Sequence, residues 1–226
     1  MLGGGWVELA AYTDASGEAR IRDVFADVEV RLVAGGWEDR WREFHRPVSV
    51  AGLWIGPPWE RTSGPGATVV VDPGRAFGTG AHPTTRACIE LLARLERGRL
   101  LDAGCGSGVI AVAASRLGYA PVLALDVDPV AVEVARATVR RNDVDVEVRR
   151  ADVLVDEIEE ADVVVANIEL GVVEQLLARR PGAVAVTSGY LAGQAPSVDG
   201  WETSSTMELD GWAAHVLGTV PALAAA

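Results

Sequence analysis

A glycine-rich turn at residues 104–108 is the feature that most constrains how this chain of 226 residues can fold. The apolar pair Leu100-Leu101 leads into it, and the segment continues Asp102-Ala103-Gly104-Cys105-Gly106-Ser107-Gly108. Residues 109–117 then favour a helix. A strand, a glycine-rich turn and a helix in this order are typical of nucleotide-type binding sites. Glycines allow close approach of the backbone to a ligand, and we expect the unpaired N–H groups of the new helix to point at the same place.

The spacing of the glycines distinguishes between classes of cofactor. A dinucleotide site of the G-x-G-x-x-G type needs its third glycine at position 109, where the sequence has Val109. The turn instead reads Asp102-x-Gly104-x-Gly106-x-Gly108. This form resembles the first motif of class I S-adenosylmethionine (SAM) methyltransferases. A glycine turn that merely connects a strand to a helix remains the alternative at this point.

A second acidic position supports a cofactor site. Asp126 ends the next apolar run and lies 22 residues after Gly104, close to the spacing of about 20 expected for an acid that accepts hydrogen bonds from ribose hydroxyls. The alternative is a surface acid at the end of a strand. Asp128, followed by Pro129, is expected to cap the next helix, because aspartate is a common N-cap and proline a common first helical residue.

The remainder of the chain alternates between strand-like and helix-like segments. We expect strands at residues 68–71, 121–125, 144–149, 163–166 and 183–186, helices at 85–95, 130–141 and 172–178, and an antiparallel pair at 201–208 and 212–220. This alternation predicts an α/β fold with a Rossmann-like, mostly parallel sheet covered on both faces. Ligands bind beyond the carboxyl ends of such strands, where we place Gly104, Asp126, Asp152 and Asn167.

A second loop with ligand-binding potential precedes the expected helix at 85–95. It reads Asp72-Pro73-Gly74-Arg75-Ala76-Phe77-Gly78-Thr79-Gly80-Ala81-His82-Pro83-Thr84-Thr85. Its hydrogen-bonding side chains are Thr79, His82, Thr84 and Thr85. The alternative is an ordinary loop in which Thr84 or Thr85 caps the helix.

The first 66 residues differ in pattern from the rest of the chain. Residues 1–44 are expected to form a small, β-rich domain, with strands at 6–12 and 28–32, a turn at 14–17 and a short helix carrying Trp37, Trp41 and Phe44. Residues 45–66 contain several prolines and glycines and are expected to be a linker with one short strand at 48–55. Residues 67–226 would then form the main domain.

Composition limits the classes of partner. The formal net charge is −12 and all 20 basic residues are arginines, which argues against nucleic-acid binding and is compatible with a cationic protein substrate. Without lysine, Schiff-base chemistry is excluded. The two cysteines, Cys88 and Cys105, suggest neither a disulfide framework nor a metal site. No signal peptide or membrane span is evident, so a cytoplasmic protein is expected. The oligomeric state is not predicted.

Five motifs together identify a family. They are the 72–85 loop given above, Leu101-Asp102-x-Gly104-Cys105-Gly106-Ser107-Gly108, Asp126-Val127-Asp128-Pro129, Ala166-Asn167-Ile168 and Ser188-Gly189-Tyr190-Leu191. In combination they resemble the ribosomal protein L11 methyltransferase family over roughly residues 37–220. The resemblance implies SAM-dependent methylation of amino groups of L11, both lysine side chains and the N-terminal amine. It also implies that residues 1–44 are a shortened substrate-recognition domain.

The resemblance also implies roles for specific residues. It implies SAM contacts at Thr85, Gly104, Asp126 and Asn167, and the glycine turn adds Gly106 to the cofactor-binding set. Asn167 is also the candidate catalytic residue, because its amide oxygen can accept an N–H and aim the lone pair of a neutral amine. Lysine has a reference pKa near ~10.4, so the enzyme must bind the neutral amine or lower this pKa. His82 is a candidate gate or late proton acceptor.

Other functions compete with this one. An RNA or DNA adenine methyltransferase would place Pro-Pro-aromatic after the asparagine to stack the base, whereas Ile168-Glu169-Leu170 follow here. A SAM-dependent methyltransferase of another protein or of a small-molecule amine is the main alternative. A non-catalytic binding module is disfavoured because Thr85, Gly104, Asp126 and Asn167 are all present.

Overall fold

The computed structural model describes residues 15–25, 28–30, 46–60, 67–72, 78 and 80–219. The chain divides into two compact units, Met1–Trp41 and Arg42–Ala226. In the described residues, none of the helices is long and apolar enough to cross a membrane. The expected strand at 6–12 and the aromatic helix with Trp37, Trp41 and Phe44 lie outside the described residues.

The described part of the first unit differs from the expected β-rich domain. Helix α1, Ala15–Arg22, occupies most of the stretch predicted as a turn at 14–17. Residues 28–30 are irregular, so the strand expected at 28–32 does not form there. Helix-favouring residues explain the first difference, since alanine, glutamate and arginine have good helix propensity. Glu18 and Arg22 add an ion pair of 2.9 Å one helical turn apart.

A seven-stranded sheet forms the centre of the second unit, in the order β6-β5-β4-β7-β8-β10-β9. Its strands are β4 (Leu100–Ala103), β5 (Val122–Asp126), β6 (Glu147–Arg150), β7 (Ala161–Asn167), β8 (Gly182–Leu191), β9 (Trp201–Leu209) and β10 (Trp212–Thr219). The first five strands in this order run parallel, and β10 is antiparallel to both β8 and β9. The predicted Rossmann-like sheet with a terminal antiparallel pair is confirmed.

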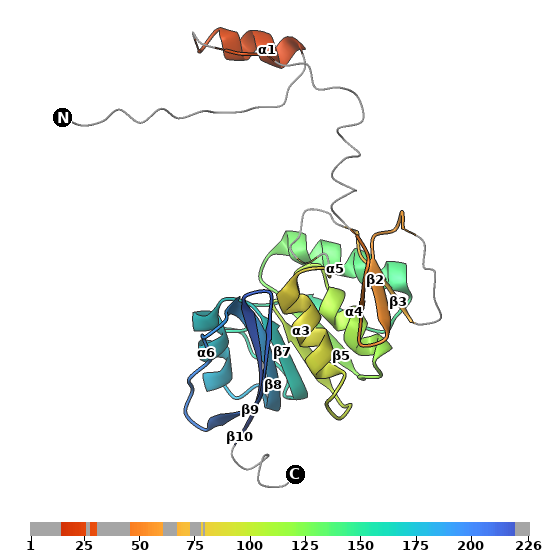
Figure 1. Ribbon diagram of the computed structural model, residues 1–226, viewed down its shortest axis with the longest axis vertical. Coiled ribbons are helices and arrows are strands. Elements are labelled where there is room, and N and C mark those ends of the chain that lie inside the picture. The colour runs from red at the N-terminus through yellow and green to blue at the C-terminus, as the bar shows by residue number, and fades with distance from the viewer. Residues whose placement is uncertain are drawn as a thin grey trace, which may run out of the picture. The chain divides into compact units, whose positions relative to one another are not determined.

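Helices cover the sheet on both faces (Figure 1). They are α3 (Pro83–Leu92), α4 (Val109–Arg116), α5 (Pro129–Asn142) and α6 (Leu170–Ala178). Side chains of α3, α4 and α5 share one buried cluster with alternate strand residues, whereas α6 belongs to the cluster on the opposite face. Leu100 and Leu101 show the alternation, because these neighbours in β4 belong to different clusters and are both almost fully buried.

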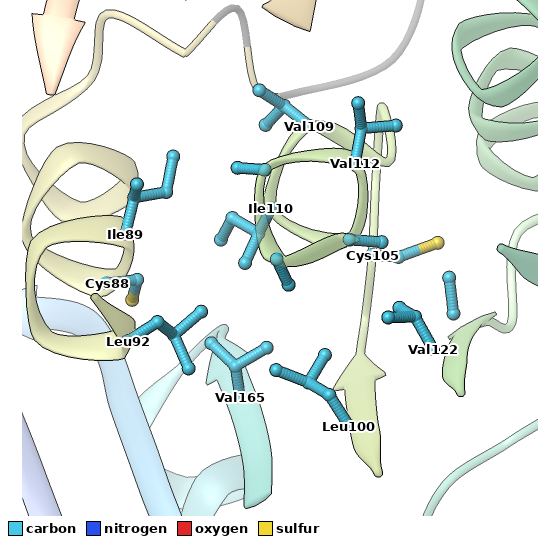
Figure 2. Close-up of a cluster of buried hydrophobic side chains, with 14 of the residues drawn as sticks. Cys88, Ile89, Leu92, Leu100, Cys105, Val109, Ile110, Val112, Val122 and Val165 are labelled. Atoms are coloured by element: carbon cyan, nitrogen blue, oxygen red, sulfur yellow. The ribbon is translucent and has the colours of Figure 1, made fainter. Parts of the chain in front are cut away.

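The larger core cluster holds the first three helices of the sheet domain in place. Figure 2 shows Ile89 and Leu92 of α3 beside Ile110 of α4, with Leu100 and Val165 of the sheet next to them. Close packing continues at the start of α4, where a Cβ on Gly108 would lie 3.0 Å from the Cβ of Ala135 in α5. The helix that follows the glycine turn is therefore packed closely against its neighbouring helices and the sheet.

A separate three-stranded sheet contains β1 (Val48–Val50), β2 (Leu53–Gly56) and β3 (Thr68–Val70). The single strand expected at 48–55 is thus two strands, joined by a tight turn in which Ala51 and Gly52 both have positive φ. The side-chain amide of Asn142 fixes this sheet to α5: its oxygen accepts from the N–H of Val70 at 2.7 Å and its nitrogen donates to the carbonyl of Val70 at 2.8 Å. The described part of the stretch 45–66 therefore packs against β3 and α3.

Candidate active site

The candidate site lies at the carboxyl ends of the parallel strands, as predicted. The turn after β4, the last residue of β5 and the last residue of β7 meet there, and the start of α3 lies against them. Gly104, Gly106 and Gly108 have φ values of 76°, 54° and 77°. Residues other than glycine rarely adopt such backbone angles, so the turn depends on all three glycines.

Asp126 and the glycine turn form one hydrogen-bonded unit. One carboxylate oxygen of Asp126 accepts from the N–H of Gly106 at 2.9 Å, and the other accepts from the N–H of Asp128 at 2.9 Å. The carbonyl of Leu125 accepts from Gly104 and Cys105 at 2.8 and 2.9 Å. The carboxylate is half-buried and has lone pairs beyond those that these two bonds use. It is therefore fixed in place and can still accept from a ligand.

Two of the first N–H groups of α4, which were expected to be unpaired, have partners within the chain. The buried carboxylate of Asp102 accepts from the N–H of Ala111 at 3.0 Å, and the hydroxyl of Ser107 accepts from the N–H of Val109 at 3.4 Å. Side chains thus cap the first turn of this helix. The spacing in sequence gave no sign of this, since it depends on how β4 packs beneath α4.

The capping carboxylate also sets the electrostatics of the turn. Burial raises the pKa of Asp102 to about 7, the bond from Ala111 opposes this rise, and the charge of Asp126 adds to it. An acid at the end of the second strand is also found in dinucleotide sites, so Val109, at the place of the third dinucleotide glycine, remains the feature that disfavours a dinucleotide.

Thr85 and Asn167 are brought together, although they lie 82 positions apart in the sequence. The side-chain nitrogen of Asn167 donates to the hydroxyl of Thr85 over 3.4 Å. Thr85 is 1% exposed, whereas Asn167 is half-buried at the end of β7. This bond uses the amide nitrogen of Asn167 and leaves its amide oxygen as an acceptor.

His82, and neither Thr84 nor Thr85, caps helix α3. Its Nδ1 accepts from the N–H of Thr84 at 3.4 Å and lies 2.7 Å from the hydroxyl of the same residue. The imidazole packs edge-on against the indole of Trp212, with ring centroids 4.9 Å apart. Burial lowers the pKa of His82, so the ring is neutral at pH 7. Sequence reasoning placed Trp212 only in a strand, and nothing local signalled this contact.

Asp152 lies in the loop after β6, beyond the carboxyl end of that strand as expected from the sequence. Its carboxylate accepts from the N–H of Leu154 at 2.9 Å, and its own N–H donates to Asp156 at 2.9 Å. These are the bonds of a local turn. In the described parts of the chain, no group of three or more His, Cys, Asp or Glu side chains is placed to hold a metal ion.

Fold and site together define a class I methyltransferase, the class that takes its methyl group from SAM. Residues 12–218 match the family model described as Ribosomal protein L11 methyltransferase (PrmA). The chain belongs to this family, which confirms the resemblance found in the sequence.

Individual relatives agree with the family model. The ribosomal protein L11 methyltransferase of Chromohalobacter salexigens is 38% identical over 87% of this chain, and that of Dictyoglomus thermophilum is 36% identical over 77%. The chain spans 71% of the length of the first and 63% of the second. Among solved structures, a ribosomal protein L11 methylase from Lactobacillus delbrueckii subsp. bulgaricus matches with a TM-score of 0.66 and 25% identity, over 74% of this chain and 95% of its own.

Proposed function

We propose that this enzyme transfers methyl groups from SAM to amino groups of ribosomal protein L11, both lysine side chains and the N-terminal amine. The pairing of Thr85 with Asn167, together with the Asp126–Gly106 unit, carries this proposal, because it would put an amide acceptor next to the proposed SAM site. The names of the relatives support L11 as the substrate. A cytoplasmic location follows from a ribosomal substrate.

The residues proposed to hold SAM have separate tasks. Asp126 would accept from the ribose hydroxyls, because its carboxylate is already oriented by the two backbone N–H groups. Gly104 and Gly106 would let the cofactor lie against the backbone. Thr85 and Asn167 would contact the methionine end. SAM supplies an activated methyl group on its sulfonium, so the protein needs no covalent nucleophile.

Asn167 is proposed to orient the acceptor amine. Its amide oxygen would accept an N–H of the neutral amine and direct the nitrogen lone pair toward the methyl group. Thr85 fixes the rotation of the amide by accepting from its nitrogen. Catalysis would then come mainly from proximity and orientation, which can reduce a barrier by about 7–11 kcal/mol. Loss of the amine proton completes the transfer, and His82, neutral and close to the site, is a candidate acceptor.

Recognition of L11 is proposed to involve residues 1–44, with residues 67–226 as the methyltransferase domain and residues 45–66 as a connector whose described part packs against that domain. The net charge of −12 supports a cationic partner through long-range attraction. This proposal separates the two activities: SAM binding belongs to the second unit, whereas affinity for L11 depends on both.

The test is transfer of labelled methyl groups from SAM to purified L11. We expect Asn167→Ala to lower kcat about 100-fold, because a misplaced amine loses most of the benefit of orientation. Gln175→Ala is the matched control, since it removes another amide, which donates to Gly171 on the exposed side of α6. The catalytic proposal fails if Asn167→Ala keeps more than a third of the wild-type rate. If the enzyme methylates a small amine but never L11, the proposal that L11 is the substrate is wrong.

A further inference from the structure

Strand β8 contains a bulge next to the candidate site. Ala213 of β10 lies opposite Tyr190, and its neighbour Ala214 lies opposite Ser188, so Gly189 has no partner in this register. Gly189 has a φ of 104°, a conformation that L side chains rarely adopt. Bulges of this kind often occur near active sites, where they bend a strand and redirect its neighbours.

The bulged glycine lies against the peptide that follows Asn167. A Cβ at Gly189 would lie 2.3 Å from the carbonyl oxygen of Ile168, 2.7 Å from its carbonyl carbon and 2.8 Å from its nitrogen. The N–H of Ile168 donates to the carbonyl of Ser188 at 3.0 Å, so this close approach is part of the pairing between β7 and β8. The three atoms in the way belong to the backbone and cannot move by rotating a side chain.

A second glycine touches the same residue from the end of β4. A Cβ at Gly104 would lie 2.6 Å from the Cγ2 methyl of Ile168. That contact involves a side chain, which can change its rotamer, whereas the contact of Gly189 involves the main chain. Of the two glycines, Gly189 therefore sets the position of the Asn167–Ile168 segment more strictly.

We propose that Gly189 is a positioning residue for methyl transfer, because its missing side chain allows the Asn167 amide to lie against Thr85 at the required place. The inference rests on the proposed function. A Cβ at 189 would have to push the Ile168 peptide by about 1 Å to reach ordinary contact distance. Asn167 is the adjacent residue, and a misplacement of about 1 Å in a catalytic group can lower a rate about 100-fold.

The test compares Gly189→Ala with Gly193→Ala. Gly193 also has a positive φ, 82°, but a Cβ there would meet nothing within 4 Å. Both variants introduce backbone strain, and only the first pushes on Ile168. We expect Gly189→Ala to lower kcat for L11 about 100-fold while the KM for SAM and the Kd of S-adenosylhomocysteine stay within about threefold. Gly193→Ala is expected to stay within about threefold in all three quantities.

A double-mutant cycle shows whether Gly189 acts through Asn167. If it does, Gly189→Ala will lower kcat much less in an Asn167→Ala background than in the wild type, because the same interaction is already lost. The inference is overturned if Gly189→Ala lowers kcat by the same factor in the wild type and in the Asn167→Ala background. It is also overturned if Gly189→Ala and Gly193→Ala have equal kcat values. A Gly189→Ala protein that does not fold, judged by circular dichroism at 10 °C and by binding of S-adenosylhomocysteine, would also overturn it. Wild-type enzyme that never methylates L11 refutes the proposed function instead.

Discussion

Replacement of Asp126 by alanine should weaken cofactor binding, whereas replacement of the nearby Asp128 should weaken only the fold. The side chain makes two internal bonds of 2.9 Å and is proposed to accept from the ribose hydroxyls. A hydrogen bond to a charged group contributes about 1.5–3 kcal/mol. Loss of the ribose contacts should therefore raise the Kd of SAM about 10- to 150-fold, since about 1.4 kcal/mol corresponds to a factor of ten.

Asp128 provides the matched control two positions along the chain. Its carboxylate accepts from the N–H of Val130 at 2.8 Å and caps α5, as the sequence predicted. Asp128→Ala should lower the free energy of unfolding by about 1 kcal/mol, the usual cost of a lost cap, and should leave the Kd of SAM unchanged. Asp126→Ala loses two internal bonds to a charged group and should lower the free energy of unfolding by about 3 kcal/mol or more.

Isothermal calorimetry with SAM and with S-adenosylhomocysteine measures the affinities, and urea unfolding measures the stabilities. The reasoning is refuted if Asp126→Ala binds SAM within threefold of the wild type. It is equally refuted if Asp128→Ala weakens SAM as much as Asp126→Ala does, because the effect would then come from the shared backbone and not from the ribose contact.

Three more predictions follow from the site and the two units. SAM should bind about 100-fold more tightly than NAD in calorimetry, because Val109 stands where a dinucleotide site needs its third glycine; tighter binding of NAD would contradict this. The folded-state pKa of Asp102, about 7, lies above its ordinary value, so its contribution to stability is present at low pH and is lost as pH rises through 7. Asp102→Asn should therefore flatten the fall in the urea midpoint between pH 5 and pH 8, and an unchanged slope would count against a buried, protonated Asp102. A protein of residues 42–226 should bind SAM normally but show a raised KM for L11; an unchanged KM would exclude the first unit from recognition.

The parts of the site that were predicted from the sequence depend on neighbours along the chain. The order of β4, glycine turn and α4, the acid that ends β5 and the Asp128 cap all follow from local spacing, and the structure contains each of them. The parallel sheet followed from the alternation of strands and helices. Hydrophobic periodicity and turn chemistry are sufficient for such features, because the residues that cause them lie within a few positions of each other.

The features that sequence reasoning missed depend on residues far apart in the chain. Asn142 fixes the small sheet across 72 positions, and His82 meets Trp212 only because α3 lies beside the start of β10. His82 caps α3 in place of the threonines, because the helix already begins at Pro83 and leaves Thr84 and Thr85 inside its first turn. The bulge at Gly189 likewise depends on the register between β8 and β10. Tertiary packing decides such contacts, and one sequence read alone carries no local pattern for them.

This enzyme is proposed to methylate amino groups of ribosomal protein L11. The most direct test incubates the purified enzyme and labelled SAM with total ribosomal protein and ribosomal RNA from cells that lack this gene, and locates the label by mass spectrometry. We predict label on L11, at lysine side chains and at the N-terminal amine, and its loss with Asn167→Ala but not with Gln175→Ala. Label on RNA, or on other proteins while L11 stays unlabelled, would contradict the account.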